Sequence, residues 1–415
     1  MSRAMMPPTM SSRAAASYDD LRRAIAREPM PCAIVDAAAF DANVDQVAEL
    51  VRRRGRGKTL RLATKSLRCP ALIERALARG GDAFVGLMTY AAGETAWWAA
   101  RGARDLLLAY PTVQRADLDH LVAANRTGAI AATIVDCAEH VDALAAAGVA
   151  AGVTLPAVID VDMSYRPAER VHIGVRRSPL RDVDAVVALA ARIARTRGVR
   201  FHGLMGYEAQ IAGLGDRDVG WRGPAVRLVK KRSAIEVARL RAAAVETLRS
   251  RGLAPTVVNG GGSGSLPGAL DEAALTEVTA GSAFLCSHLF DHYEDVRFTP
   301  AAYFALQIVR RPAPGLVTCQ GGGFVASGAA GADRLPIPAL PPGLSLLALE
   351  GAGEVQTPVR VPDSAAALAL GDPIFFRHAK AGELAEHAAE YLIVRDGRVV
   401  ERAPTYRGLG QCWIG

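Results

Sequence analysis

The sequence predicts an α/β protein in which a closed (β/α)8 barrel of the TIM type is followed by a mostly antiparallel β domain. Short apolar runs alternate with alanine-rich amphipathic stretches up to about residue 295, which is typical of repeated βα units. Eight of these runs follow one another from residue 60 onward, and eight strands favour a closed barrel over an open sheet. We therefore divide the chain into an N-terminal tail (1–30), a barrel (31–295) and a C-terminal β domain (296–415).

The predicted barrel strands are near-continuous apolar runs, as expected for a parallel sheet that is covered on both faces. They are 60–65, 82–87, 105–110, 131–136, 156–162, 200–207, 256–261 and 277–282. Helical periodicity between them is clear at 40–54, 70–80 and 183–198. The earlier run at 32–36 is interpreted as the crossover from the tail into the barrel. After residue 295, short strand-like runs separated by glycine and proline turns predict antiparallel strands.

Composition excludes several classes of protein. With 50% hydrophobic and 22% charged residues, the chain resembles a globular protein and not a disordered one. Its basic residues are scattered despite a net charge of +7, so we expect no nucleic-acid partner. No apolar run is long enough to span a membrane. The six cysteines contain no CxxC pair, which favours reduced thiols and a cytoplasmic location.

Lys65 stands out because lysine is rare in this chain. Of 49 basic residues only five are lysines, so arginine supplies most of the positive charge. Lys65 ends an apolar strand in the run RLATKSLRCP (61–70). Unlike arginine, a desolvated lysine can lose its proton and attack a carbonyl carbon. The C-terminal end of a barrel strand is also where the active sites of such barrels lie.

Two glycine-containing runs end the last two predicted strands. The runs are NGGGSGS (259–265) and AGS (280–282), and the loops after strands seven and eight form the usual phosphate site of these barrels. Successive backbone N–H groups in such loops can surround an anion, although a flexible turn is the alternative for the first run. A carbonyl-reactive lysine beside a phosphate cradle predicts pyridoxal 5'-phosphate as the cofactor.

Together these motifs resemble the fold-type III pyridoxal-phosphate enzymes, which have an alanine-racemase-like barrel. The likeness is greater to the D-threonine aldolase and D-serine dehydratase branch, and it covers roughly residues 30–415. It rests on TKSLRCP (64–70), GYE (206–208), GGGSGS (260–265) and the Gly371-Asp372 turn before His378. The resemblance implies these cofactor-binding residues: Lys65, Arg166, Tyr207, Gly260, Gly261, Gly262, Ser263, Gly281 and Ser282.

The sequence departs from the pattern of this branch at the C-terminal histidine. There, a cysteine or aspartate two positions later completes a divalent-metal pair, whereas this chain has Lys380 after His378. An ammonium group cannot bind a metal. Either another carboxylate such as Glu383 completes the site, or Lys380 replaces the metal's positive charge, and we favour the second hypothesis. A surface role for His378 and Lys380 is the remaining alternative.

The arginine expected near the cofactor's phenolic oxygen is also displaced. The run IDVDMSYRPAERVHIGV (159–175) departs from the pattern of this branch, so Arg166 fills the position, or His172 does. Tyr207 is expected to face the cofactor, with barrel packing as its alternative role. Phe284 stands where the resemblance implies a tyrosine near the phosphate, which leaves Ser263 or Ser282 to compensate.

The resemblance implies a lyase that holds its cofactor as a Schiff base on Lys65. Cleavage of Cα–Cβ in a D-3-hydroxy amino acid needs a base for the β-hydroxyl group, for which His378 and Lys380 are the candidate catalytic residues. The alternatives are a dehydratase, a racemase with a second base such as Tyr303, and a non-catalytic pyridoxal-phosphate-binding protein. Enzymes of this family usually complete their sites across a subunit boundary, so a homodimer is expected.

Overall fold

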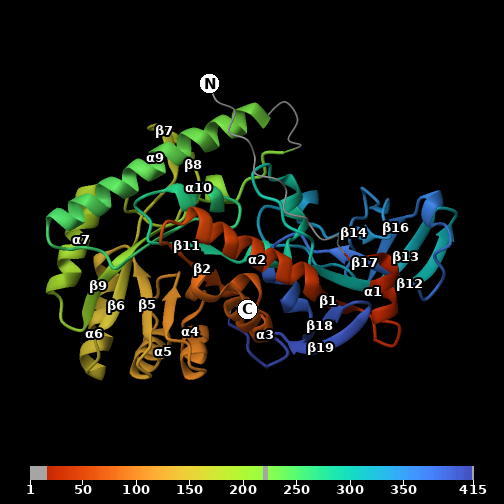
Figure 1. Cartoon of the computed structure of the whole chain (residues 1–415), viewed down its shortest axis with the longest axis horizontal. Coiled ribbons are helices and arrows are strands. Elements are labelled where there is room, and N and C mark those ends of the chain that lie inside the picture. Colours follow the sequence, from red (N-terminus) through yellow and green to blue (C-terminus); the bar gives the residue numbers. More distant parts are fainter. Residues whose placement is uncertain (1–15, 218–222, 414–415) are drawn as a thin grey trace.

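The computed structural model describes residues 16–217 and 223–413, and it confirms the predicted fold class. Eight parallel strands close into a barrel in the order β10-β11-β2-β3-β4-β5-β6-β9 (Figure 1). They correspond one by one to the eight predicted runs. Their bounds are β2 Thr59–Ala63, β3 Phe84–Thr89, β4 Asp105–Leu108, β5 Ile130–Val135, β6 Leu155–Asp160, β9 Val199–Gly206, β10 Val257–Gly260 and β11 Glu277–Ala280.

Helices cover the outside of the barrel with their apolar faces inward. In α7, Asp182 caps the first turn by accepting from the N–H of Ala185, and the face that includes Val186 and Ile193 is buried. The long helix α9, which the sequence analysis did not single out, runs along the outside of the barrel (Figure 1). The helices after β1 are α2 Ala37–Arg54, α3 Pro70–Gly80, α4 Ala92–Ala100, α5 Arg115–Arg126, α6 Ala138–Ala151, α7 Val183–Arg195, α8 Ala209–Ala212, α9 Gly223–Ser250, α10 Leu266–Asp271 and α11 Ser282–Leu285.

The second domain is a nine-stranded, mainly antiparallel sheet with the order β15-β16-β13-β12-β1-β18-β19, and β17 and β14 branch from β12. Its strands are β1 Cys32–Asp36, β12 Ala302–Ala313, β13 Leu316–Gln320, β14 Ile337–Leu340, β15 Ser345–Leu346, β16 Gln356–Arg360, β17 Pro373–Arg377, β18 Glu390–Arg395 and β19 Arg398–Pro404. Among the described residues, no helix combines the length and the apolar character needed to cross a membrane.

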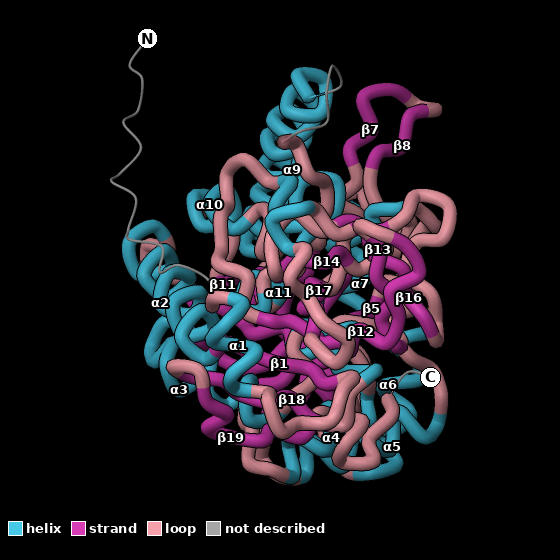
Figure 2. The backbone as a smooth tube through the Cα atoms, turned by 90° about the vertical axis from the view of Figure 1, so that its right-hand side faces the viewer, coloured by secondary structure: helices cyan, strands magenta, loops and turns pink. Residues whose placement is uncertain are grey.

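The N-terminal segment takes part in this second sheet. β1 pairs antiparallel with β12 and parallel with β18, so the run at 32–36 is a sheet strand that leads into α2. Helix α1 (Tyr18–Ala24) lies on the same sheet (Figure 2). Its Leu21 is buried with Ile34 and Phe375, and the Tyr18 hydroxyl donates to the carbonyl of Pro373 at 3.1 Å. The predicted tail at 1–30 is thus ordered from residue 16, and residues 1–15 lie outside the described residues.

A buried arginine connects the strand of Lys65 to its neighbours. Arg61 on β2 is 1% exposed. Its guanidinium donates to Glu277 of β11 at 2.6 and 2.8 Å and to Asp105 of β4 at 2.8 and 3.1 Å. Burial alone would lower the pKa of Arg61, but these two carboxylates raise it above its usual range. Asn259 of β10 donates to Glu277 as well, so the network joins four barrel strands.

We expect Arg61→Met to destabilise the protein strongly. The substitution leaves Glu277 buried without its counter-ion, and breaking a buried pair in this way costs about 3–5 kcal/mol. Arg115→Met is the matched control, because Arg115 pairs with Asp119 on the surface, where both side chains are more than half exposed, and such pairs contribute at most about 1 kcal/mol. Urea unfolding followed by circular dichroism measures both. Equal midpoints for the two variants would contradict the role given to Arg61.

Candidate active site

Barrel closure brings Lys65 beside the two glycine-containing loops. β11 pairs with β2, with Ala280 opposite Leu62, and β10 pairs with β11. Lys65 lies in the short 3-10 helix Thr64–Ser66 that directly follows β2. The last and first strands of the barrel are therefore neighbours, and the loops that end β10 and β11 lie next to the lysine. This is the grouping of Lys65, 259–265 and 280–282 that the sequence analysis expected.

Serine hydroxyls and backbone amides line this part of the barrel mouth. The hydroxyl of Ser66, next to Lys65, lies 3.2 Å from that of Ser282. The hydroxyl of Ser263 accepts from the backbone N–H groups of Gly281 at 3.2 Å and Ala283 at 3.1 Å. These short polar groups come from the ends of three adjacent strands. They have the donor chemistry that a phosphate group requires, and Ser282 is in contact with the residue next to Lys65.

The glycines at these strand ends are required by close packing. A Cβ on Gly281 would lie 2.7 Å from the carbonyl oxygen of Ala63, and one on Gly262 would lie 3.0 Å from Ala212 and 3.3 Å from the Tyr207 ring. Gly261 has φ +83°, a conformation that side chains disfavour. A flexible turn would not need such residues. The run at 259–265 is therefore a closely packed loop, which fits a cradle for a bound phosphate.

A buried ion-pair network holds this glycine loop (residues 259–265) in place. Arg241 of α9 is 1% exposed and donates to the Gly206 carbonyl at 3.0 Å and to Glu208 at 3.1 Å. Ser265 donates to Glu208 at 3.1 Å and accepts from the N–H of Gly262 at 3.1 Å. A Cβ on Gly260 would lie 2.8 Å from the Arg241 guanidinium. Helix α9, which no sequence motif connects with the site, thus holds the glycine loop in place.

Lys65 has a direct partner that the sequence analysis missed. Its Nζ donates to the hydroxyl of Tyr110, which follows β4, at 3.1 Å. Burial tends to raise the pKa of Tyr110, but the positive charges of Lys65, Arg177 and Lys380 outweigh it and hold the pKa below its usual value. Tyr110 ends the predicted strand 105–110, so its strand-end position was the available signal. The lysine amine and this phenol are therefore direct neighbours in the candidate site.

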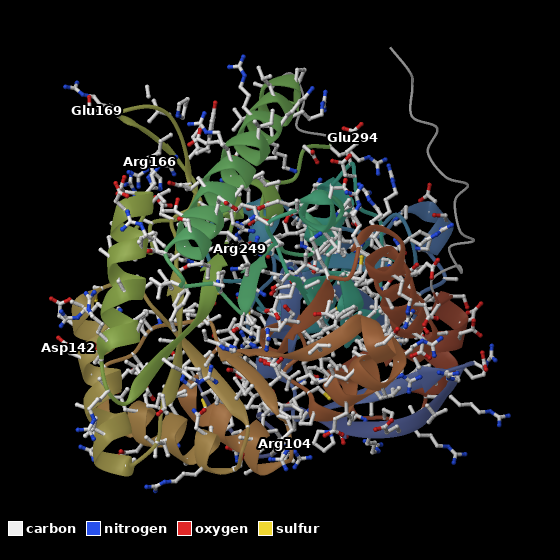
Figure 3. The ribbon with its side chains drawn as sticks, turned by 60° about the vertical axis from the view of Figure 1, so that its left-hand side comes forward. Arg104, Asp142, Arg166, Glu169, Arg249 and Glu294 are labelled. Carbon is white, nitrogen blue, oxygen red and sulfur yellow. The ribbon has the colours of Figure 1, made fainter. Side chains whose placement is uncertain are left out.

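Arg166 and Arg177 lie in different places. Arg166 is on β7 (Tyr165–Ala168), which forms an arm with β8 (Val171–Ile173), and Figure 3 shows Arg166 and Glu169 on this arm. Arg166 pairs with Asp162 at 2.6 Å and its side chain is 42% exposed. The guanidinium of Arg177, in contrast, lies 5.5 Å from the centre of the Tyr207 ring and acts on Tyr110. Arg177 therefore faces the barrel mouth, whereas Arg166 is engaged by the arm.

Tyr207 lies between Arg177 and the glycine loop. Burial raises the pKa of Tyr207 to about 12, the negative charge of Glu208 adds to that shift, and Arg177 opposes it. The phenol is therefore neutral at physiological pH and can donate a hydrogen bond. Its ring packs beside Gly262. Phe284 is fully buried against Phe40 and Phe84, so it is a core residue.

The carboxylates of Asp136 and Asp160 lie at the ends of β5 and β6. Burial raises the pKa of Asp160 to about 7, and the nearby charge of Asp136 raises it further, while Arg177 opposes the shift.

Asp136, Cys137 and His140 place one carboxylate, one thiol and one imidazole within 4.8 Å of one another. Within the described ranges, this is the one group of three or more such residues that is close enough to share a metal ion.

His378 and Lys380 lie after β17, where the resemblance places a metal pair. His378 is 3% exposed, and neither ring nitrogen has a hydrogen-bond partner. Burial lowers the pKa of His378 to about 3, the charges of Arg377 and His288 lower it too, and the Ala381 backbone opposes the shift. Lys380 donates to the Ser327 carbonyl at 3.2 Å and to its hydroxyl at 2.8 Å.

These surroundings do not fit a divalent cation at His378. Its charged neighbours are cationic, and Lys380 stands where a second ligand is required. Glu383, the carboxylate considered as a replacement ligand, accepts from the N–H of Ser327 at 2.9 Å and lies 3.8 Å from Lys380. Glu383 is therefore hydrogen-bonded to Ser327, the residue that Lys380 also contacts.

η7 (Ala381–His387) brings the β domain to the lysine. A Cβ on Gly382 would lie 2.6 Å from the Lys65 carbonyl oxygen, so the segment after Lys380 packs directly on the backbone of the lysine. The β domain thus closes one side of the site within a single chain.

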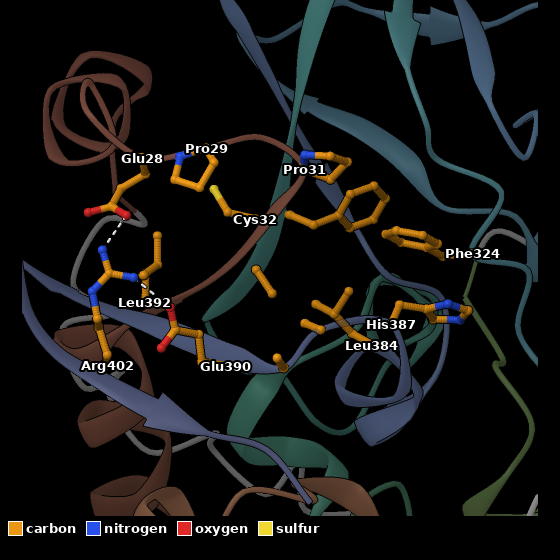
Figure 4. A pocket seen from close by; sticks show the side chains of 14 residues that line it. Glu28, Pro29, Pro31, Cys32, Phe324, Leu384, His387, Glu390, Leu392 and Arg402 are labelled. Atoms are coloured by element: carbon orange, nitrogen blue, oxygen red, sulfur yellow. Dashed lines mark hydrogen bonds and ion pairs between the residues drawn. The ribbon is translucent and has the colours of Figure 1, made fainter. Parts of the chain in front are cut away.

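A separate cavity of about 220 Å³ lies in the β domain (Figure 4). Arg402 bridges Glu28 and Glu390 at one end, and His387 stacks on Phe324 at the other. Cys32 is its one thiol, and burial raises the pKa of that thiol to about 12, with the charge of Glu28 adding to the shift. The lining contains none of the predicted site residues, so the cavity is not part of the Lys65 site.

Comparisons with known proteins agree with the fold and the motifs. The D-threonine aldolase of an Arthrobacter species is 27% identical over 366 residues, which cover 85% of this chain and 88% of the relative. The structure of D-threonine aldolase from Filomicrobium marinum superposes with a TM-score of 0.76 at 22% identity, over 92% of this chain and 96% of that one.

A dehydratase has nearly the same fold. D-threo-3-hydroxyaspartate dehydratase from Delftia sp. HT23 superposes with a TM-score of 0.75 at 19% identity, over 92% of this chain and 98% of that one. The likeness to the D-threonine aldolase branch, expected from the motifs, is confirmed. The family model for the alanine racemase N-terminal domain matches residues 35–287. The chain belongs to the alanine racemase N-terminal domain family.

Proposed function

We propose that this protein is a pyridoxal-phosphate-dependent lyase that cleaves the Cα–Cβ bond of D-3-hydroxy amino acids. The observation that carries the proposal is the amine of Lys65 beside the cradle formed by Ser66, Ser282 and the glycine loop. Similarity to D-threonine aldolase over most of both chains supports the reaction type. When bound, the cofactor supplies a carbonyl group that Lys65 can hold and a ring that accepts electrons from the bond that breaks.

The residues of the site have distinct roles in this proposal. Lys65 would hold the cofactor through its amine. The cradle residues bind the phosphate group; they are Gly260, Gly261, Gly262, Ser263, Gly281 and Ser282. Tyr207, with Arg177 5.5 Å from the centre of its ring, would contact the cofactor, and Arg166 is the alternative arginine. Lys380 provides the positive charge for which the branch uses a metal, and His378 lies beside it as a neutral, enclosed group.

Dehydration is the alternative, and the similarity to D-threo-3-hydroxyaspartate dehydratase favours it specifically. In that reaction Lys65 removes the α-proton and an acid assists departure of the hydroxyl group.

A racemase is less well supported, because the candidate second base, Tyr303, is 2% exposed and donates to the Pro300 carbonyl at 3.3 Å. The β domain argues against a non-catalytic binding protein. The proposal includes a homodimer and a cytoplasmic location, which rest on the resemblance and on cysteine usage.

Proton NMR of the cofactor-loaded protein with D-threonine in D₂O distinguishes the reactions. We expect glycine and acetaldehyde, because the proposed bond cleavage releases both. The appearance of 2-oxobutyrate would instead identify a dehydratase. Deuterium at Cα without any cleavage would identify proton transfer of the racemase type.

Lys65→Ala should abolish the visible absorption band of the bound cofactor, because no other amine lies at this position. Lys58→Ala is the matched control: Lys58 immediately precedes the other end of the same strand, where its Nζ contacts the Gly55 carbonyl at 3.2 Å. Absorption spectra after incubation with pyridoxal phosphate and gel filtration give the readout. A Lys65→Ala variant with the wild-type band would refute the assignment.

We expect activity toward D-threonine to survive removal of divalent ions. The cationic surroundings of His378 and the position of Lys380 argue against an essential metal there. Activity is measured after dialysis against EDTA, and again after Mn²⁺ or Zn²⁺ is added back. Loss of activity that either ion restores would contradict the replacement of a metal by Lys380. Lys380→Met should lower kcat in the chelator-treated enzyme.

A further inference from the structure

Tyr110 has the position of a reacting group. Its hydroxyl oxygen lies 3.1 Å from the Nζ of Lys65, which is hydrogen-bond distance from the atom that exchanges with the substrate amine in the proposed reaction. The side chain is half-buried at the mouth of the barrel. The phenol is thus partly shielded from water and still reachable from the site.

The charged groups around Tyr110 come from three different parts of the chain. Lys65 follows β2, Arg177 follows the β7–β8 arm, and Lys380 precedes η7, and each favours the phenolate form. Tyr207 is a further ionisable neighbour, and it is neutral at physiological pH. Three cations that surround one phenol oppose the effect of burial. The site therefore stabilises a negative charge on the Tyr110 oxygen.

His378 is poorly suited to the task that the resemblance assigns to it. Both of its ring nitrogens are enclosed, so a substrate cannot touch them in this conformation. Its cationic neighbour Arg377 also opposes its protonation. A base for the substrate hydroxyl must be reachable and must hold the proton it receives. Tyr110 meets both requirements.

We propose that Tyr110 is the catalytic residue that takes the proton of the substrate's 3-hydroxyl group. This inference rests on the proposed Cα–Cβ cleavage. The phenolate oxygen accepts the hydroxyl proton, and the electron pair of that O–H bond becomes the second bond of the aldehyde carbonyl. The pair of the broken Cα–Cβ bond stays with the amino-acid fragment, which takes up a proton from water to give glycine. Tyr110 then returns its proton to water.

Tyr110→Phe tests the role with little structural change, because it removes only the hydroxyl group. Tyr391→Phe is the matched control: it removes a buried hydroxyl that has no hydrogen-bond partner, and burial raises the pKa of that tyrosine above its usual range. Removing a general base typically lowers the rate by about 10²–10⁴-fold. We expect a loss of this size in kcat for D-threonine in Tyr110→Phe, with the cofactor absorption band retained, and wild-type kcat in Tyr391→Phe.

A second readout is independent of activity. The protein contains nine tyrosines, and ¹³C labelling at Cζ reports the ionisation of each by NMR during a pH titration. In full-length protein, with and without pyridoxal phosphate, we expect one resonance to titrate below pH ~10, the usual value for tyrosine. It should be absent in Tyr110→Phe and present in Tyr391→Phe. Lys65→Met should raise its midpoint, because a neighbouring cation is lost.

The outcomes separate this inference from the proposed function. If the wild-type protein cleaves D-threonine and Tyr110→Phe keeps its kcat and pH profile, Tyr110 is not the base. The absence of any tyrosine that titrates early would also overturn the inference. If the wild-type protein does not cleave D-threonine, the proposed lyase reaction fails, whereas an early-titrating Tyr110 would still support the charge arrangement around it.

Discussion

Closure of the barrel between β11 and β2 is the constraint on which the site depends. It places the end of the first barrel strand, with Lys65, beside the end of the last, with Gly281 and Ser282. The buried guanidinium of Arg61 connects these strands through Glu277 and also pairs with Asp105 of β4, two strands away in the barrel. Without that closure, residues more than two hundred positions apart in sequence would have no reason to meet. Fold stability and cofactor geometry therefore rest on the same contacts.

Electrostatics distinguishes this site from the metal-containing pattern that the sequence resembles. Positive charge comes from Lys65, Arg177 and Lys380, all of which act on Tyr110. A divalent ion would add to this positive charge, and His378 offers it one ligand beside the cationic Arg377. An arrangement of fixed ammonium and guanidinium groups can stabilise a developing oxyanion without a metal. The half-buried phenol is then the natural group to exchange a proton with the substrate.

Most of the fold could be predicted because its signals are local. Each barrel strand is an apolar run, and Lys65 and the glycine loop stand at the ends of such runs. The rest depends on contacts between distant segments. The role of β1 in the second sheet follows from pairing with β12 and β18, which no local pattern encodes. Arg241 reaches the glycine loop from α9. The sequence around Arg241 is typical of an ordinary basic helix, so it does not indicate this contact.

The site shows the same division between local and distant information. Arg166 was one of two candidates for the arginine position, yet on the β7–β8 arm it pairs with Asp162, and Arg177 lies beside Tyr207 instead. The central claim is that Lys65 alone binds the cofactor covalently. Borohydride reduction of the loaded protein, followed by peptide mass spectrometry, tests it directly. We predict the reduced cofactor on Lys65 among the five lysines; a label on Lys380 or another lysine, or no label, would contradict the account.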